Sequence, residues 1–133
     1  MADKLSFALV SPERELFNGE VDHVVVPGSE GAFGVLPNHA PVMSVIKPGA
    51  LVIYNDGGER RIFVNGGFAD VTPDGLTVLA EEAIDLADIN AADLEQQHKN
   101  ASEDVRDANS DAKRDAAQRA LDRLEAIKAA MAG

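Results

Sequence analysis

Three histidines are the side chains in this chain of 133 residues that could most readily do chemistry. His23, His39 and His98 lie far apart in the sequence, and none has a second potential ligand at the spacing of a metal site. A polar position on a strand accounts for His23, and packing on a helix accounts for His98. We therefore expect no metal site and no cofactor. Cysteine is absent, which excludes disulfides, thiolate zinc sites and thiol catalysis and suits a reducing compartment.

The glycine-rich segment Gly28–Gly34 superficially resembles a phosphate-binding loop. It lacks the lysine with which a Walker loop reaches the phosphates, and residues 33–36 continue as a strand instead of opening a helix. A tight connection between two strands explains the glycines. Carboxylates are plentiful, but the sequence places no two of them in contrasting apolar and polar surroundings, as acid–base catalysis requires. The sequence therefore indicates no active site.

Acidic side chains dominate the charge balance. Twenty-three acidic and twelve basic residues give a net charge of -11, which repels nucleic acid and anionic lipid headgroups. No apolar run approaches the length of about eighteen residues that a membrane span needs, and the first residues lack the pattern of a secretory signal. We expect no binding to nucleic acid, and contact with a membrane only through a protein partner.

Basic side chains are concentrated in residues 113–128. On a helix at 100° per residue, Arg119 and Arg123 lie beside an apolar arc, and Lys113, Arg114 and Lys128 also flank it. Two interpretations remain open. The helix face is either solvated, with intrahelical pairs worth about 0.2–0.5 kcal/mol each, or it is a docking edge for an acidic partner surface.

The composition changes abruptly near residues 84–88. All six prolines, all five phenylalanines and ten of the eleven glycines lie before that point. Residues 87–133 contain thirteen alanines and no proline, as uninterrupted helices require. We predict one domain over residues 1–86 and a second over residues 87–133.

The first domain is predicted to be all-β, because short runs rich in Val, Ile, Leu and Phe alternate with Gly, Pro and Asn. Asp56-Gly57 and Pro73-Asp74-Gly75 are typical of hairpin turns. The pattern favours two antiparallel sheets packed as a sandwich or flattened barrel. Nine strands are predicted, over residues 5–10, 13–17, 21–26, 32–36, 42–46, 50–54, 60–64, 67–71 and 76–79.

The second domain is predicted to be an antiparallel hairpin of two helices. Asp88 or Asn90 caps the first helix, and Asn109-Ser110 marks a break and a second cap. Because the apolar stripes are rich in alanine, they bury little area, and we expect the hairpin to dock on another surface. The stripes are Leu94, His98, Ala101, Val105 and Ala108 on the first helix and Ala116, Ala117, Ala120, Leu121, Leu124, Ile127 and Met131 on the second.

Several segments together resemble a known family. Residues 26–41, VPGSEGAFGVLPNHAP, are followed by IKPG at residues 46–49, and VNGGFADV at 64–71 is followed by VLAEEA at 78–83. These segments, in this order, resemble the epsilon subunit of bacterial F-type ATP synthase, which is called delta in mitochondria. The chain length and the division into a β part and a helical part also agree with that family.

The resemblance implies a ten-stranded β-sandwich that binds the central-stalk gamma subunit and rests on the ring of c subunits. A two-helix regulatory domain follows it. Such a subunit belongs to the rotor, performs no chemistry itself and helps couple proton passage to ATP synthesis in the alpha/beta head. The resemblance also implies a peripheral location in F1, on the cytoplasmic face of the bacterial inner membrane. In many bacterial members the hairpin can extend along gamma and obstruct rotation in the hydrolysis direction.

The same resemblance carries roles onto particular residues. Glu30, Ala32 and His39 correspond to the part that meets the polar loops of the c-ring. Ala32 stands where relatives often have an acid, so an apolar contact is expected there. Arg119 and Arg123 correspond to bases that approach an acidic segment of the beta subunit. Lys113, Arg114 and Lys128 are secondary candidates for the same role.

Some bacterial relatives bind ATP between the helices and the sandwich, through a motif of Ile or Leu, Asp, two variable residues, Arg and Ala. The matching residues 89–94 are INAADL, with Asn90 in place of the acid and Asp93 in place of the arginine. A carboxylate repels the triphosphate that an arginine would bind. We therefore expect no ATP binding by this chain.

A second hypothesis comes from a different class of protein. A free-standing β-sandwich could bind a small ligand that its helices sense. Co-purification with a membrane-bound ATPase distinguishes this hypothesis from that of a rotor subunit.

Overall fold

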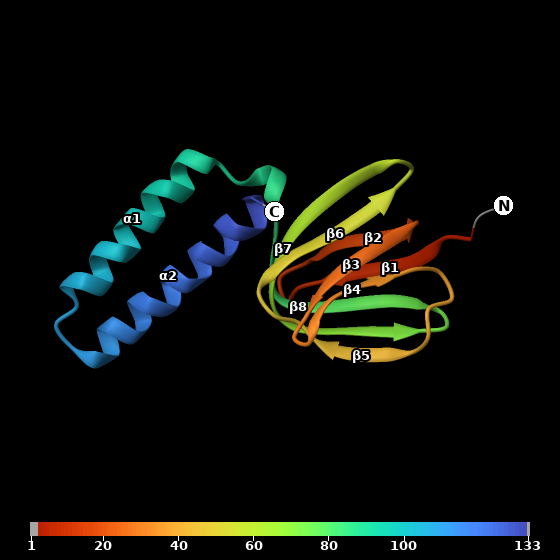
Figure 1. Ribbon diagram of the computed structural model, residues 1–133, viewed down its shortest axis with the longest axis horizontal. Helices are drawn as coiled ribbons and strands as arrows, with labels where there is room; N and C mark the ends of the chain where they lie inside the picture. The colour runs from red at the N-terminus through yellow and green to blue at the C-terminus, as the bar shows by residue number, and fades with distance from the viewer. Residues whose placement is uncertain (1–2, 133) are drawn as a thin grey trace. The chain divides into compact units, whose positions relative to one another are not determined.

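The computed structural model describes residues 3–132, which form eight β-strands, a short 3-10 helix and two α-helices (Figure 1). The elements are β1 (Leu5–Val10), β2 (Glu15–Val21), β3 (His23–Gly28), β4 (Gly31–Val35), β5 (Val42–Val45), β6 (Gly49–Asn55), β7 (Gly58–Thr72), β8 (Gly75–Asp85), η1 (Leu86–Asp88), α1 (Ala91–Asp107) and α2 (Asp111–Ala132). The chain forms two compact units, of which the first ends at Leu86 and the second begins at Ala87.

The strands of the first unit form one continuous hydrogen-bonded sheet. Its order is β2-β1-β8-β7-β6-β3-β4, and β5 pairs with β7 outside this path. β7 has 15 residues, and it pairs with β6 through its first half and with β5 through its second half. Because β7 belongs to both halves, the sheet folds over on itself and encloses a core, as predicted for a β-sandwich.

The structure has eight strands, fewer than the nine predicted from the sequence pattern and the ten implied by the family resemblance. A bend inside β7 explains part of the difference. The predicted strands at 60–64 and 67–71 are one strand, whose pairing with β8 continues across Gly66 and Gly67. These two glycines have φ angles of 74° and 101°, which other residues rarely adopt. A Cβ atom at Gly67 would also collide with the carbonyl oxygen of Leu79 on β8. The glycines therefore bend the strand without ending it.

One strand pair is parallel, so the prediction of purely antiparallel sheets is wrong at this point. β1 pairs with β2 in the antiparallel sense but with β8 in the parallel sense, with Phe7 opposite Leu76. Parallel neighbours need a long connection, and most of the first unit lies between β1 and β8. Pairing between such distant segments leaves no signal in local sequence patterns.

Both predicted hairpin turns are confirmed. Asp56 and Gly57 have φ angles of 53° and 83° and join β6 to β7. Thr72 pairs with Gly75 at the start of β8, so the turn falls at residues 73 and 74. These turns fix the register of the longest strands.

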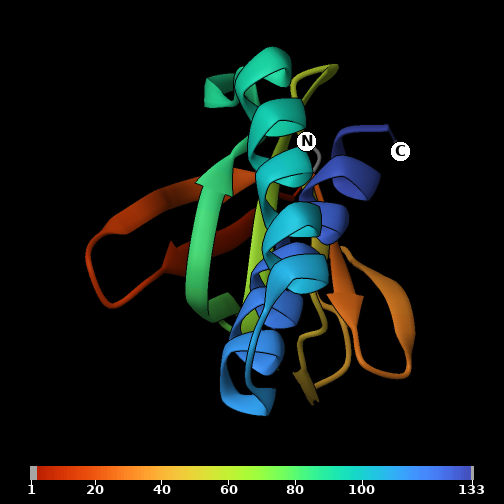
Figure 2. The same ribbon diagram turned by 90° about the vertical axis from the view of Figure 1, so that its left-hand side faces the viewer.

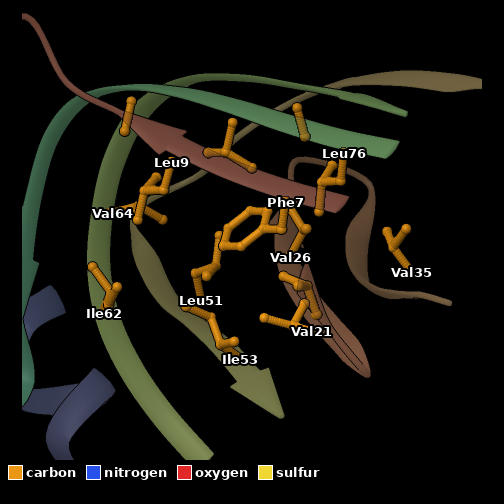
Figure 3. Close-up of a cluster of buried hydrophobic side chains, with 14 of the residues drawn as sticks. Phe7, Leu9, Val21, Val26, Val35, Leu51, Ile53, Ile62, Val64 and Leu76 are labelled. Atoms are coloured by element: carbon orange, nitrogen blue, oxygen red, sulfur yellow. The ribbon is translucent and has the colours of Figure 1, made fainter. Parts of the chain in front are cut away.

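The core of the sandwich is made of aliphatic side chains with one central aromatic ring (Figure 3). Phe7 is buried, and its ring centroid lies 5.5 Å from that of Phe17. Leu9, Leu51 and Ile62 are fully buried around it. Each such side chain contributes about 1.5–3 kcal/mol through removal from water, so this core stabilises the fold that carries the exposed residues.

The second unit is a hairpin in which α1 and α2 run side by side in opposite directions (Figures 1 and 2). The Oδ1 atom of Asn90 accepts a 3.0 Å bond from the backbone N–H of Asp93, and Ser110 Oγ accepts a 3.2 Å bond from that of Lys113. Asn90 and Ser110 are therefore the caps. The predicted stripe holds only in part, because Ala116 and Ala120 are exposed. The buried helical side chains are Leu94, Ala101, Leu124, Ile127 and Ala130.

Candidate interaction surfaces

The histidines occupy separate sites. The ring of His23 stacks on Tyr54 at 5.3 Å between centroids. The Nδ1–H of His39 donates to the carbonyl oxygen of Ala40 at 2.7 Å, and His98 lies on α1. Among residues 3–132, no group of three His, Asp or Glu side chains is arranged to hold a metal ion. No helix in that part of the chain is long and apolar enough to cross a membrane.

The glycine-rich segment is a tight hairpin, as the sequence predicts. Gly28 at the end of β3 pairs with Gly31 at the start of β4, so Ser29 and Glu30 form the turn. The N–H of Ser29 donates to the carbonyl oxygen of Val45 at 2.8 Å, which holds the turn against β5. We call Ser29, Glu30 and the adjoining Ala32 the β3–β4 tip.

The three residues assigned to the c-ring contact do not lie together. Glu30 and Ala32 are both exposed at the β3–β4 tip. His39 is half-buried, and it follows the opposite end of β4, in the loop that leads to β5 (Figure 1). A strand of five residues spans roughly 15 Å, so only Glu30 and Ala32 can belong to one small contact.

An exposed apolar row crosses three strands, and the sequence analysis missed it. Val45 on β5 lies opposite Phe68 on β7, which lies opposite Leu79 on β8. These side chains are 63%, 39% and 40% exposed. Phe68 and Leu79 also line a hollow of about 390 Å³ together with Val10 and Pro12. We call Val45, Phe68 and Leu79 the apolar row.

A signal for this surface is present in the sequence. Residues 42–46, VMSVI, are nearly all apolar, whereas a strand with one wet face alternates apolar and polar residues. Such a run predicts a strand covered on both faces. In this chain the outer side of β5 is not covered, and Met43 is 66% exposed beside the row.

The basic side chains of α2 differ in their surroundings. Lys128 Nζ lies 2.9 Å from Glu95 Oε1 on α1, and Arg114 Nη1 lies 3.2 Å from Asp111 Oδ1 in the first turn of its own helix. Arg119 is exposed and Arg123 is half-buried. Since they are four residues apart, these two arginines lie on the same face of α2.

One ion cluster stabilises the sandwich near its N-terminal strand. Lys4 Nζ lies 2.7 Å from Asp22 Oδ1 and 3.0 Å from Asp56 Oδ1. The bond to Asp22 and then that to Asp56 raise the pKa of Lys4. The Lys4 ammonium, and then the backbone N–H of Asp56, lower the pKa of Asp22. The cluster attaches the β6–β7 turn to the junction between β2 and β3.

These features define a class of protein that works through contacts with other proteins. A sandwich with an exposed apolar row carries a hairpin of two amphipathic helices with basic residues on one of them. Exposed apolar side chains that lie next to one another are typical of protein interfaces.

Comparison with known proteins identifies the family. The family described as "ATP synthase, Delta/Epsilon chain, beta-sandwich domain" matches residues 4–86. The ATP synthase epsilon chain of Maricaulis maris is 58% identical over 132 residues, 99% of each chain. That of Rhodospirillum rubrum is 46% identical over 134 residues and all of both chains. The chain therefore belongs to the delta/epsilon chain family of ATP synthase, and the resemblance found in its sequence is confirmed.

Solved structures agree with the fold. A chain of the Euglena gracilis mitochondrial ATP synthase superposes with a TM-score of 0.82 at 23% identity, over 96% of this chain and 81% of that chain. A chain from the central stalk and c-ring of the Tetrahymena thermophila enzyme gives a TM-score of 0.65 at 18% identity, over 98% of both chains. As a member of this family the chain is a non-catalytic subunit of the ATP synthase complex. The comparisons support this hypothesis and not that of a free-standing ligand-binding protein.

Proposed function

We propose that the chain is a rotor subunit of the central stalk of a proton-translocating ATP synthase. It binds the gamma subunit and the c-ring, and it helps couple proton passage to ATP synthesis in the alpha/beta head. It is a peripheral part of F1 and lies on the cytoplasmic face of the bacterial inner membrane. The full-length match to epsilon chains supports this proposal, as does the fold shared with chains of two mitochondrial ATP synthases.

The apolar row is the observation that carries the proposal for gamma. Val45, Phe68 and Leu79 lie side by side across β5, β7 and β8 and are exposed in the single chain. Burial of apolar surface yields about 25 cal/mol per Å², and a few buried side chains carry most of the energy of a typical interface. The gamma subunit binds over this row.

The β3–β4 tip is proposed as the contact with the c-ring. Glu30 supplies one carboxylate and Ala32 a small apolar surface, both exposed. His39 lies at the far end of β4 and belongs to a separate part of the surface.

The helical hairpin is proposed to modulate ATP hydrolysis. Arg119 and Arg123 share one face of α2 and approach an acidic segment of the beta subunit when the hairpin extends. Lys128 is paired with Glu95 on α1, and Arg114 is paired with Asp111 of its own helix.

We propose that this chain itself binds no nucleotide. Asn90 caps α1 by accepting from the N–H of Asp93, and the carboxylate of Asp93 lies in the first turn. Helix capping and the helix dipole account for both residues. Calorimetric titration with Mg-ATP should give no saturable heat below about 1 mM. A one-to-one binding isotherm in that range would contradict this part of the proposal.

Two experiments test whether gamma binds over the apolar row: binding of the chain to a gamma subunit, and reconstitution of ATP synthase depleted of its epsilon chain. The double variant Val45→Ser with Leu79→Ser should bind gamma at least about tenfold more weakly and restore less proton pumping. Leu36→Ser is the matched control, because Leu36 is 56% exposed but lies outside the row. Equal binding by the double variant and the control would overturn the assignment of the row to gamma.

A further inference from the structure

Two hollows of about 390 Å³ each adjoin on the surface of the first unit. The first is the hollow beside the apolar row, lined by Phe68 and Leu79, and we call it the apolar hollow. The second, which we call the acidic hollow, lies between the β1–β2 turn and β8, and its charged lining residues are Glu13, Arg14, Glu81 and Glu82. Pro12 and Glu81 line both hollows, so the two form one continuous depression.

Glu81 is held at the junction of the two hollows by the geometry of β7 and β8. Along β8, Ala80 is buried whereas Leu79 and Glu81 are exposed, because successive side chains of a strand point to opposite faces. The carboxylate of Glu81 lies over the bend of β7, where a Cβ atom at Gly66 would be 2.7 Å from its Oε2 atom. The glycine therefore leaves the space that this carboxylate occupies.

The opposite wall of the depression is the turn between β1 and β2. The backbone N–H and the Oγ–H of Ser11 both donate to the carbonyl oxygen of Arg14, at 2.9 Å and 3.2 Å. These two bonds close the turn that carries Pro12 and Glu13. The wall is therefore formed before any partner binds.

Negative charge dominates this part of the surface. Three carboxylates and one guanidinium are the charged groups among the described residues that line the acidic hollow. The sequences of β1, β2, β5 and β8 contain no lysine or arginine, and neither do residues 65–72 of β7. A second copy of this chain, bound through the same face, would bring carboxylates against carboxylates, and the phosphates of lipids or nucleic acid would be repelled. The depression therefore suits a protein surface that is apolar at one end and basic at the other.

We propose that gamma fills both hollows with neighbouring side chains, an aliphatic or aromatic one in the apolar hollow and a lysine or arginine that pairs with Glu81. This inference rests on the proposed binding of gamma over the apolar row, and it adds the chemistry that gamma presents there. A partner that covered the row with apolar side chains alone would remove the charge of Glu81 from water without compensation, which is costly. A base beside the apolar side chain supplies that compensation.

The spacing of Leu79 and Glu81 limits how gamma can present these two side chains. The two residues lie on one face of β8 and are two positions apart, which corresponds to about 7 Å along the strand. Side chains two positions apart on an extended segment of gamma match this spacing. Side chains three or four positions apart on a helix, about 5–6 Å from each other, also fit. Residues that are adjacent in the sequence of gamma point in different directions and do not fit.

Binding of the full chain to a gamma subunit tests the pairing. Glu81→Gln keeps the size of the side chain and should bind gamma at least about threefold more weakly, and Glu81→Lys at least about tenfold. The matched controls are Glu59→Gln and Glu59→Lys, because Glu59 is exposed near the start of β7 and lies outside both hollows. These controls should bind like the original chain. The loss at Glu81 should be greater in about 0.05 M than in about 0.5 M salt, because salt screens charge pairs.

Charge reversal on gamma identifies the base. Each lysine and arginine on the surface of gamma is replaced by glutamate in turn, and one of these gamma variants should bind the Glu81→Lys chain more tightly than unaltered gamma does. Failure of every gamma variant to do so would overturn the pairing. Equal binding of unaltered gamma by Glu81→Gln and Glu59→Gln would overturn it as well.

The double variant Val45→Ser with Leu79→Ser separates this inference from the proposed function. Weak binding by that double variant together with normal binding by Glu81→Gln would overturn the pairing but leave gamma on the apolar row. Normal binding by both would overturn the assignment of the row to gamma, and the pairing with it.

Discussion

At the scale of single residues, backbone geometry and side-chain exposure set what each position can tolerate. Gly67 has a φ angle of 101° and passes so close to Leu79 of β8 that no Cβ atom fits. The neighbouring Phe68 is exposed at the same bend. The glycine that bends β7 therefore also helps to present the apolar row.

Replacing Gly67 with alanine should destabilise the sandwich strongly. The new Cβ atom would meet backbone atoms of β8, and a positive φ angle alone costs about 1–3 kcal/mol for other residues. We expect a loss of about 2 kcal/mol or more, measured from urea unfolding. Gly58→Ala is the control, because its nearest contact is 3.6 Å away and its φ angle is not positive. Equal stability of the two variants would contradict this explanation of the bend.

Reversing Arg119 and Arg123 to glutamate should relieve inhibition of ATP hydrolysis without affecting assembly. Each exposed ion pair is worth less than about 1 kcal/mol, so one substitution should shift hydrolysis only a few-fold and both should be needed for a clear effect. The measurement is steady-state hydrolysis by reconstituted enzyme, with Lys99→Glu on α1 as a control that matches the charge change of each single arginine reversal. If removal of the hairpin activates ATP hydrolysis but the double variant leaves hydrolysis unchanged, this electrostatic contact is ruled out.

At the scale of elements, local turn chemistry was predictable and long-range pairing was not. Asp56-Gly57 and Ser110 act where the sequence places them, because hairpin turns and helix caps depend on neighbouring residues. The parallel pairing of β1 with β8 depends on residues far apart in the chain. The apolar row was missed for the same reason, since Val45 and Leu79 belong to different strands and come together only across β7.

The ion cluster of Lys4 should make the sandwich sensitive to acid. In the folded state the Lys4 ammonium lowers the pKa of Asp22 below the ordinary aspartate value of 3.8, so the stabilisation is present above about that pH and is lost as the pH falls through the lowered value. Lys4→Met should destabilise the protein at pH 7 and reduce the further loss of stability between pH 5 and 3.

Urea unfolding at a series of pH values provides the measurement for this cluster. Lys99→Met on α1 is the control, because it removes the same charge from an exposed position in the other unit. If the Lys4 variant and the original chain lose equal stability between pH 5 and 3, the cluster does not contribute to acid sensitivity.

At the scale of the whole molecule, the surfaces proposed for gamma and for the c-ring both lie in the first unit, whereas the proposed regulatory residues lie in the second. The family match at residues 4–86 covers only the sandwich. Assembly and regulation are therefore expected to be separable by shortening the chain.

A chain that ends at Asp88 should fold, bind gamma and support coupling. This end point keeps all of β8 and the 2.8 Å contact between Arg60 Nε and Asp85 Oδ2, which a shorter chain would put at risk. Its β-sheet should unfold in one cooperative transition, and it should restore proton pumping to ATP synthase depleted of its epsilon chain. Hydrolysis should be at least as fast as with the full chain, because Arg119 and Arg123 are gone. Restoration of pumping by the full chain but not by the shortened chain, when both bind gamma, would place an essential coupling contact in the helices.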